Sequence, residues 1–275
     1  MMNQSYRIVL LLAVLVGAAL TQLNQVQANG PKATDVQQKM ELFNGKNLDG
    51  WYTWNRGLGK NNDQSKTFTV HDGLIHVSGQ DMGCITTEKE FSNYRFTVEY
   101  KWGDKTWGGR KGKAMDSGVV IHSFGEDGAF GGIWAKSVEA NLCEGATGDF
   151  WIVGGINDGI SGTCVATQRS PGRRVFDPKN GKPTTIVSNG QGNFQNRFAA
   201  PDWKDVQGFR GPDDVDKAND WNTMIVVAEG NSMIVYVNGT LVNEITGLKQ
   251  DCGKIQLQSE GAEIFFRKVT IEPLK

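Results

Sequence analysis

The sequence has almost no excess of charge of either sign. Its 275 residues contain 29 Lys and Arg against 30 Asp and Glu, which gives a formal net charge of -1 at pH 7. No run of basic residues occurs, so nucleic acid is not expected as a partner. A chain with this charge remains compatible with neutral ligands such as carbohydrates.

Several signatures of catalytic and metal-binding classes are missing from the sequence. It has no G-x-S-x-G, no H-E-x-x-H and no EF-hand loop. It also has no C-x-x-C, and His71, His76 and His122 show no ligand-like spacing with the cysteines, so no zinc site is expected. The E-x-D-x-x-E run of laminarinase-type retaining glucanases is absent, because Glu139 is followed two positions later by Asn141.

No apolar run is long enough for a comfortable membrane span. The run Ile8–Leu20 is well short of the ~20 residues that a spanning helix needs. Arg7 before it and the Val-Gln-Ala sequence at 26–28 are typical of a secretory signal peptide and its cleavage site. We therefore expect a signal peptide over residues 1–28, with an uncleaved anchor as the alternative, then a polar linker over 29–39. The mature protein is expected to be periplasmic or secreted, without membrane contact after signal cleavage.

Cysteines are few, and all of them lie in the expected mature part. An exported protein can form disulfides. Cys143 and Cys164 flank one turn-rich segment and are the favoured local pair, with free buried thiols as the alternative. The four cysteines are Cys84, Cys143, Cys164 and Cys252.

The chain shows neither an amphipathic helical pattern of useful length nor an internal repeat. Glycine accounts for 35 of 275 residues, above the usual ~7%. Turn dipeptides such as Asn44-Gly45 and Asp72-Gly73 separate short alternating segments. About ten to twelve strands are expected, and residues 155–220 form the longest irregular region. This pattern predicts an all-β, two-sheet jelly-roll sandwich with long loops.

The stretch from Trp134 to Trp151 has the strongest pattern for a binding site. It alternates, so Glu139 and Asn141 lie on a polar face opposite Val138 and Ala140. Carboxylates, amides and tryptophans together are the groups that bind sugars, although a water-facing sheet surface would have a similar pattern.

A second carboxylate is needed for acid–base chemistry, and the sequence leaves two candidates. Glu144 is five positions after Glu139, and this odd separation places the two on opposite faces unless a bulge or the strand end reorients Glu144. Glu260, on the penultimate strand, is the alternative partner. That strand also carries Gln256 and Gln258 on its polar face.

Motifs in order over nearly all of residues 40–275 resemble a known family. It is the 3-keto-disaccharide hydrolase family (3-keto-glucoside 1,2-lyases and 3-keto-2-hydroxy-glucal hydratases), formerly a domain of unknown function. The resemblance implies a single, exported domain over 40–275 with a concanavalin A-like jelly roll. Two positions depart from the common pattern, Asn141 for glutamine and Ala135 for proline. The matching motifs are Glu41–Trp51, Asp116–His122, Trp134–Gly145, Gly148–Trp151, Asp220–Asn222, Val237–Gly239, Gly253–Gly261 and Glu263–Arg267.

The resemblance also implies a reaction on a carbohydrate substrate oxidised at C3. The ketone acidifies the C2 hydrogen, a base removes it, the C1 aglycone leaves with help from an acid, and water adds to the product. We expect Glu139 as base and Glu144 or Glu260 as acid, with His122 or Lys136 as donor to the enolate oxygen. Alternation along its strand is expected to place His122 on the face shared by Gly118 and Val120.

The remaining candidates would position the substrate. No cofactor is expected; a divalent metal could stabilise the enolate, but no ligand set in the sequence indicates one. The alternative functions are a non-catalytic carbohydrate-binding sandwich and a conventional glycoside hydrolase. The candidate substrate-binding residues are Asp116, Asn141, Trp134, Trp151, Gln256, Gln258 and Arg267.

Overall fold

The computed structural model describes residues 33–170, 173–188, 203–211 and 214–275. The expected signal peptide lies outside the described residues. Residues 34–36, expected to be linker, already belong to the folded domain. Strand β1 (Thr34–Asp35) pairs with β8 (Phe91–Ser92), and Val36 is buried in the core.

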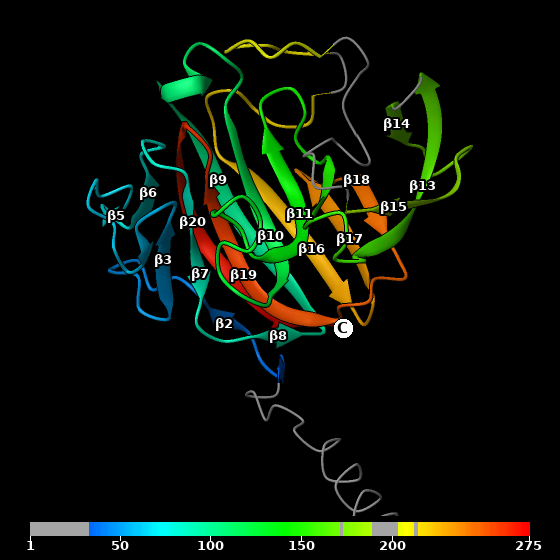
Figure 1. Cartoon of the computed structure of the whole chain (residues 1–275), viewed down its shortest axis with the longest axis horizontal. Coiled ribbons are helices and arrows are strands. Elements are labelled where there is room, and N and C mark those ends of the chain that lie inside the picture. Colours follow the sequence, from blue (N-terminus) through cyan, green and yellow to red (C-terminus); the bar gives the residue numbers. More distant parts are fainter. Residues whose placement is uncertain (1–32, 171–172, 189–202, 212–213) are drawn as a thin grey trace, which may run out of the picture. The chain divides into compact units, whose positions relative to one another are not determined.

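One large antiparallel sheet carries the strand that stands out in the sequence. It has nine strands, of which seven follow one path and β8 and β1 attach at β19. Figure 1 shows this sheet stacked with a second one. The order is β12 (Phe150–Val153), β11 (Lys136–Cys143), β10 (Asp116–Phe124), β19 (Cys252–Ser259), β7 (Gly83–Thr87), β3 (Trp51–Asn55) and β4 (Gly59–Lys60).

The second large sheet has eight strands, and β2 (Met40–Glu41) attaches to it at β20. A continuous apolar core unites side chains from both sheets. The all-β, two-sheet sandwich predicted from the sequence is therefore confirmed, with a concanavalin A-like jelly-roll architecture. The order is β18 (Thr240–Ile245), β17 (Ser232–Val237), β16 (Asn222–Glu229), β9 (Tyr94–Thr106), β20 (Ala262–Pro273), β6 (Leu74–Val77) and β5 (Phe68–His71).

The region expected to be irregular contains a small sheet of its own. Strands β14 (Arg173–Phe176), β13 (Ser161–Ser170) and β15 (Lys182–Val187) pair in that order. The expectation of a long irregular stretch is wrong for these segments, because backbone pairing across the sequence joins short strands that have only a weak alternating pattern. In the described part of the chain the one helical element is a 3-10 turn, η1 (Gly108–Arg110), so no helix there could cross a membrane.

Cys143 and Cys164 are not joined in a disulfide, so the expected Cys143–Cys164 pairing is wrong. Cys164 packs into the main core between the sheets. Cys143 lies on the other face of its sheet, in a small cluster with Ala114 and Ala146. The two thiols therefore point into different parts of the molecule although they flank one segment of sequence.

Alternation along β19 determines what each face of the nine-stranded sheet presents. Ile255 and Leu257 point into the main core, whereas Gln256 and Gln258 lie on the opposite face. Both amide side chains are nevertheless fully buried. Other parts of the chain must therefore cover this second face.

An apolar cluster with a loop across it covers one end of that face. The indole N–H of Trp54 donates to the Gly132 carbonyl at 3.1 Å, and the Tyr52 hydroxyl donates to Asp127 at 2.9 Å. These bonds fasten residues 125–133 over the sheet, and the polar face of β11 and β19 becomes an enclosed site. The cluster comprises Cys84, Ile133, Trp134 and Val153, with Trp54, Met82, Phe130 and Trp151 packed against it.

Candidate active site

Glu139 lies in the middle of β11 on the face turned away from the core, and it is only 5% exposed. Residues directly opposite each other in neighbouring strands share a face, so its row across the sheet shows what surrounds it. The row places an aromatic side chain on one side of Glu139 and a glutamine two strands away on the other. It reads Trp151, Glu139, Val120, Gln256, Thr86 and Tyr52.

Gly118 leaves the space in which two polar side chains meet. A Cβ at this position would overlap both Oε1 of Glu139 and Oε1 of Gln258. Gly118 stands opposite Asn141 in the pairing of β10 with β11. The missing side chain thus lets Glu139, from β11, and Gln258, from β19, converge above β10.

Replacing Gly118 with Ala is therefore expected to disturb the site directly. The added methyl group must displace Glu139 or Gln258, which we expect to cost about 1–3 kcal/mol of unfolding free energy and at least about tenfold in turnover. Urea unfolding and initial rates measure the two effects. Gly211→Ala is the matched control, because a Cβ there meets its nearest neighbours at 3.5 Å. Wild-type behaviour of the Gly118 variant would contradict this geometry.

Glu139 and Glu260 are carboxyl groups that act on each other's charge. Burial, and then the charge of Glu260, raise the pKa of Glu139 well above its ordinary value, with Gln258 acting in the opposite direction. Burial raises the pKa of Glu260 to about 7, against the lowering effect of Arg110. Two carboxylates so placed cannot both ionise easily, so the pair retains a proton near neutral pH.

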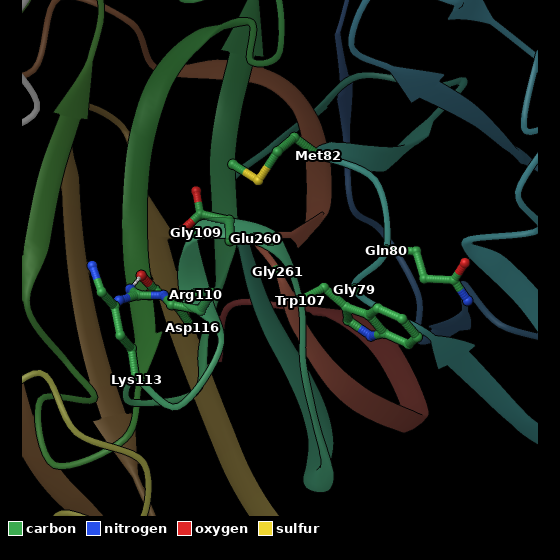
Figure 2. A pocket seen from close by; sticks show the side chains of 11 residues that line it. Gly79, Gln80, Met82, Trp107, Gly109, Arg110, Lys113, Asp116, Glu260 and Gly261 are labelled. Carbon is green, nitrogen blue, oxygen red and sulfur yellow. Dashed lines mark ion pairs between the residues drawn. The ribbon is translucent and has the colours of Figure 1, made fainter.

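A cavity of about 410 Å³ opens beside Glu260. Glu260 and Asp116 lie on its wall, and Figure 2 shows Arg110 next to Asp116, with which it forms an ion pair. Arg110 also binds Asp205 at 2.7 Å. The guanidinium group is thus held near Glu260 from two sides, which favours loss of the proton from Glu260 before Glu139. The lining residues are Gly79, Gln80, Met82, Trp107, Gly108, Gly109, Arg110, Lys113, Asp116, Glu260 and Gly261.

Buried amides next to the pair have few partners within the protein. Within the described residues, the amide of Gln258 has no hydrogen-bond partner other than Glu139, whose pKa it lowers, and Oε1 of Gln256 has none. The Gln256 amide N–H donates to Thr86 at 3.0 Å. Buried polar atoms are normally paired, so amides that the protein leaves unpaired are suited to bind the hydroxyl or carbonyl groups of a ligand.

Glu144 does not join the pair, although it was one of the two expected acids. Its Oε2 accepts the backbone N–H of Met115 at 3.2 Å and of Gly208 at 2.9 Å. Its carbonyl oxygen accepts the indole N–H of Trp203 at 2.9 Å. Glu144 therefore fastens the segment 203–210 to the end of β11, and the structure brings Glu139 together with Glu260 instead.

His122 was expected on the face shared by Gly118 and Val120, and that expectation is wrong. Both ladders of β10 shift register around it, and it has a positive φ of 52°. This bulge turns its ring toward the core, edge-on to Tyr94 at 5.6 Å between ring centroids. Burial there lowers the pKa of His122 to about 4. A neutral imidazole against Tyr94 is not brought to the carboxyl pair.

Lys136 and Arg267 also lie away from the pair. The Lys136 ammonium binds Asp158 at 2.7 Å. Arg267 belongs to β20 in the eight-stranded sheet, where it binds Glu99 at 2.7 Å and stacks on Trp221 at 4.0 Å. The expectation that Arg267 shares the site is wrong, because its strand belongs to the opposite sheet.

Among the other expected residues, the structure gathers most near the pair. Gln256, Gln258 and Asn141 lie on the same face of the sheet as Glu139, while Asp116 forms part of the cavity wall. Trp134 and Trp151 pack in the apolar cluster beside Glu139. Their expected contact with substrate stays a prediction.

Sequence reasoning missed Trp107, Arg110, Gln80 and Met82. They lie in two loops, at 79–82 and 107–113, and the glycine and lysine content of the second indicated only irregular structure. No local signal could have placed them beside Glu260. Among the described residues no group of three or more His, Cys, Asp or Glu side chains could hold a metal ion.

The pKa of Glu260 predicts how stability depends on pH. An unfolded glutamate has a pKa of about 4.3, so the folded state binds more protons between this value and about 7. Stability is then greatest at low pH within this window and falls as pH rises through it. Glu260→Gln should remove this loss. We expect its unfolding free energy, relative to that of the wild type, to increase by roughly 1–3 kcal/mol from about pH 5 to pH 8. Urea unfolding at both pH values tests this, and a gap that does not grow with pH would contradict the raised pKa.

Comparisons with solved structures give loose likenesses to proteins described in carbohydrate terms. A putative glycosyl hydrolase from Parabacteroides distasonis ATCC 8503 is 19% identical, with a TM-score of 0.49 over 86% of this chain and 94% of that one. The carbohydrate binding module CBM66 from Bacillus subtilis is 15% identical, with a TM-score of 0.42 over 81% and 95%. The β-glucanase of Bacillus licheniformis is 11% identical, with a TM-score of 0.41 over 86% and 99%. No curated protein matches the chain significantly.

A family model gives the stronger result. The model of the 3-keto-alpha-glucoside-1,2-lyase-like domain matches residues 38–272, which include nearly the whole described sandwich. The resemblance inferred from the sequence motifs is thereby confirmed, and a carbohydrate-active function is supported. The matched range shows that this chain belongs to the 3-keto-alpha-glucoside-1,2-lyase-like family.

Proposed function

We propose that this protein is an exported enzyme that cleaves 3-keto-glucosides by C2 deprotonation, elimination of the C1 aglycone and hydration. The observation that carries the proposal is the pair of interacting carboxyl groups, Glu139 and Glu260, of which Glu260 lines a cavity. One proton shared between two carboxyl groups supplies an acid and a base at the same pH. That is what the elimination needs.

The surroundings of the two carboxyl groups assign the two functions. Arg110 favours the ionised form of Glu260, whereas Glu139 is more deeply buried and retains its proton. We therefore assign Glu260 as the base that removes the C2 proton and Glu139 as the acid that protonates the leaving oxygen. This reverses the function expected for Glu139 from the sequence.

The two steps restore the pair. Elimination moves the C2 proton to Glu260 and the Glu139 proton to the leaving aglycone, while the C1–O bond breaks and a C1=C2 double bond forms. In the hydration, the oxygen of water adds to C1 while Glu139 takes a proton from that water. Glu260 returns its proton to C2. Each carboxyl group ends in its starting state, and the product is 3-keto-glucose.

The enolate oxygen needs a donor, and neither His122 nor Lys136 is brought to the pair. We assign this function to the amide N–H group of Gln258, which is buried beside Glu139. Among the described residues, this amide has no partner other than Glu139. A preorganised donor in a water-poor site stabilises a developing oxyanion strongly.

The experiment is incubation with 3-keto-trehalose or 3-keto-sucrose beside the unoxidised sugars. Cleavage of the keto forms alone supports the proposal. Cleavage of the unoxidised sugars would indicate a conventional glycoside hydrolase, and binding without cleavage would indicate a carbohydrate-binding module. Mass spectrometry of the protein recovered after expression tests export, with a mature N-terminus at Asn29 expected.

A further inference from the structure

Trp107 is an exposed aromatic side chain on the wall of the cavity. It is 36% exposed, and among the described residues it is one of five large hydrophobic side chains with at least this exposure. The other four do not line the cavity. An apolar ring left open beside a polar site suggests contact with a ligand.

Hydrogen bonds hold Trp107 in place and occupy its polar atoms. Its indole N–H donates to the Ser78 carbonyl at 2.8 Å. Its backbone N–H donates to the Gly261 carbonyl at 2.7 Å, and its own carbonyl accepts the Arg110 N–H at 2.9 Å. Because the indole N–H is already bonded within the protein, a ligand meets the ring of Trp107 through contact with its surface.

The surroundings of Trp107 leave room for a ring-shaped group. Gly79, Gly108, Gly109 and Gly261 line the same cavity, together with Met82. A Cβ at Gly108 or Gly109 would meet no atom within 4 Å, so the space above this turn is open. The apolar part of the cavity is therefore made of backbone, one thioether and one indole.

The position of the apolar part of the cavity relative to the carboxyl pair decides which part of a substrate it contacts. The backbone N–H of Trp107 is hydrogen-bonded to the carbonyl of Gly261, the residue directly after Glu260. In Figure 2, Trp107 lies on one side of Glu260, while Arg110 and Asp116 lie on the other. The oxidised ring must place C1 and C2 at the carboxyl pair and its hydroxyls at the buried amides. With the ring so placed, a group at C1 that enters the cavity on its apolar side meets Trp107.

We propose that Trp107 stacks on the leaving group and makes the enzyme selective for 3-keto-glucosides whose C1 substituent is a ring with an apolar face. This inference rests on the proposed function. A second pyranose ring and an aromatic aglycone share the required chemistry. An O-methyl group does not, because it offers no ring to stack on.

The test compares three substrates in the Trp107→Ala and Trp107→Phe variants. Trp107→Ala is expected to lower kcat/KM about 10- to 100-fold for 3-keto-trehalose and for an aryl 3-keto-glucoside, chiefly through KM. Methyl 3-keto-glucoside should change by less than about twofold, and Trp107→Phe should retain most of the activity. A loss for only one of the two ring-bearing substrates supports the inference and identifies the leaving group. Equal losses for all three substrates, or no loss for either ring, overturn it.

Two controls separate the causes of a loss. Leu58→Ala truncates a side chain that is also 36% exposed but lies outside the cavity, and its kinetics should match the wild type. Trp107→Phe keeps an aromatic ring and so retains a surface for stacking. The melting temperatures of Trp107→Ala and Trp107→Phe show whether a loss of activity reflects a loss of folded protein.

Failure of the proposed function would be visible separately. If the wild type cleaves none of the three substrates, the proposed function has failed, and stacking is then tested by binding alone. Titration with phenyl glucoside or trehalose should change the tryptophan fluorescence of the wild type but not that of Trp107→Phe. The same change in both proteins would overturn the inference.

Discussion

Glu139→Gln and Glu260→Gln are each expected to lower turnover of 3-keto-glucosides by about 10²- to 10⁴-fold. Each variant keeps the shape of the side chain but removes one of the two groups that exchange protons with the substrate. The double variant should be little worse than either single one, because groups that act as a unit are not additive. Initial rates of 3-keto-glucose release near pH 7 measure the effect. Retained turnover in either variant would contradict the assignment of Glu139 and Glu260 as acid and base.

Hydrogen exchange at C2 distinguishes the acid from the base. In deuterated water, Glu139→Gln should still exchange the C2 hydrogen of the substrate while failing to cleave it, because Glu260 remains as base. Glu260→Gln should do neither. The opposite pattern would assign the base to Glu139. Glu99→Gln is the matched control, since Glu99 lies on β9 of the other sheet and binds Arg267 and Lys268.

Glu144→Ala is expected to destabilise the protein while leaving the chemistry intact. The carboxylate is 6% exposed and accepts two backbone N–H groups, from Met115 and Gly208. Removing it leaves both donors unpaired, which we expect to cost about 2–4 kcal/mol of unfolding free energy. For a domain of this size that corresponds to a melting temperature lower by about 2–4 °C per kcal/mol.

The comparison of stability with activity decides what Glu144 does. Turnover per folded molecule should stay within about threefold of the wild type, since the carboxyl pair is elsewhere. Glu126→Ala is the control, because Glu126 is exposed and should change neither quantity. A variant with unchanged stability and lost turnover would restore Glu144 as the acid expected from the sequence.

Local alternation in the sequence was enough to determine the faces of the main strands. On β11 and β19 it separated Glu139, Asn141, Gln256 and Gln258 from the core side chains, and the structure agrees. Side chains on a strand alternate with a period of two, so this property needs no information from distant parts of the chain. For the same reason, the odd separation of Glu139 and Glu144 already argued against the two side chains sharing one face.

Only the tertiary structure decided which of these faces meet and what surrounds them. The bulge at His122 reversed one expected side chain, and the strand of Arg267 belongs to the other sheet. Arg110 and Trp107 reach Glu260 through a turn with no distinctive local pattern. Strand neighbours, bulges and loop positions depend on contacts between residues far apart in the chain, which local periodicity does not encode. The sequence alone thus determined a strand with Glu139 at its centre and side chains suited to binding sugars on its polar face. The fold decided that the carboxyl group next to Glu139 is that of Glu260.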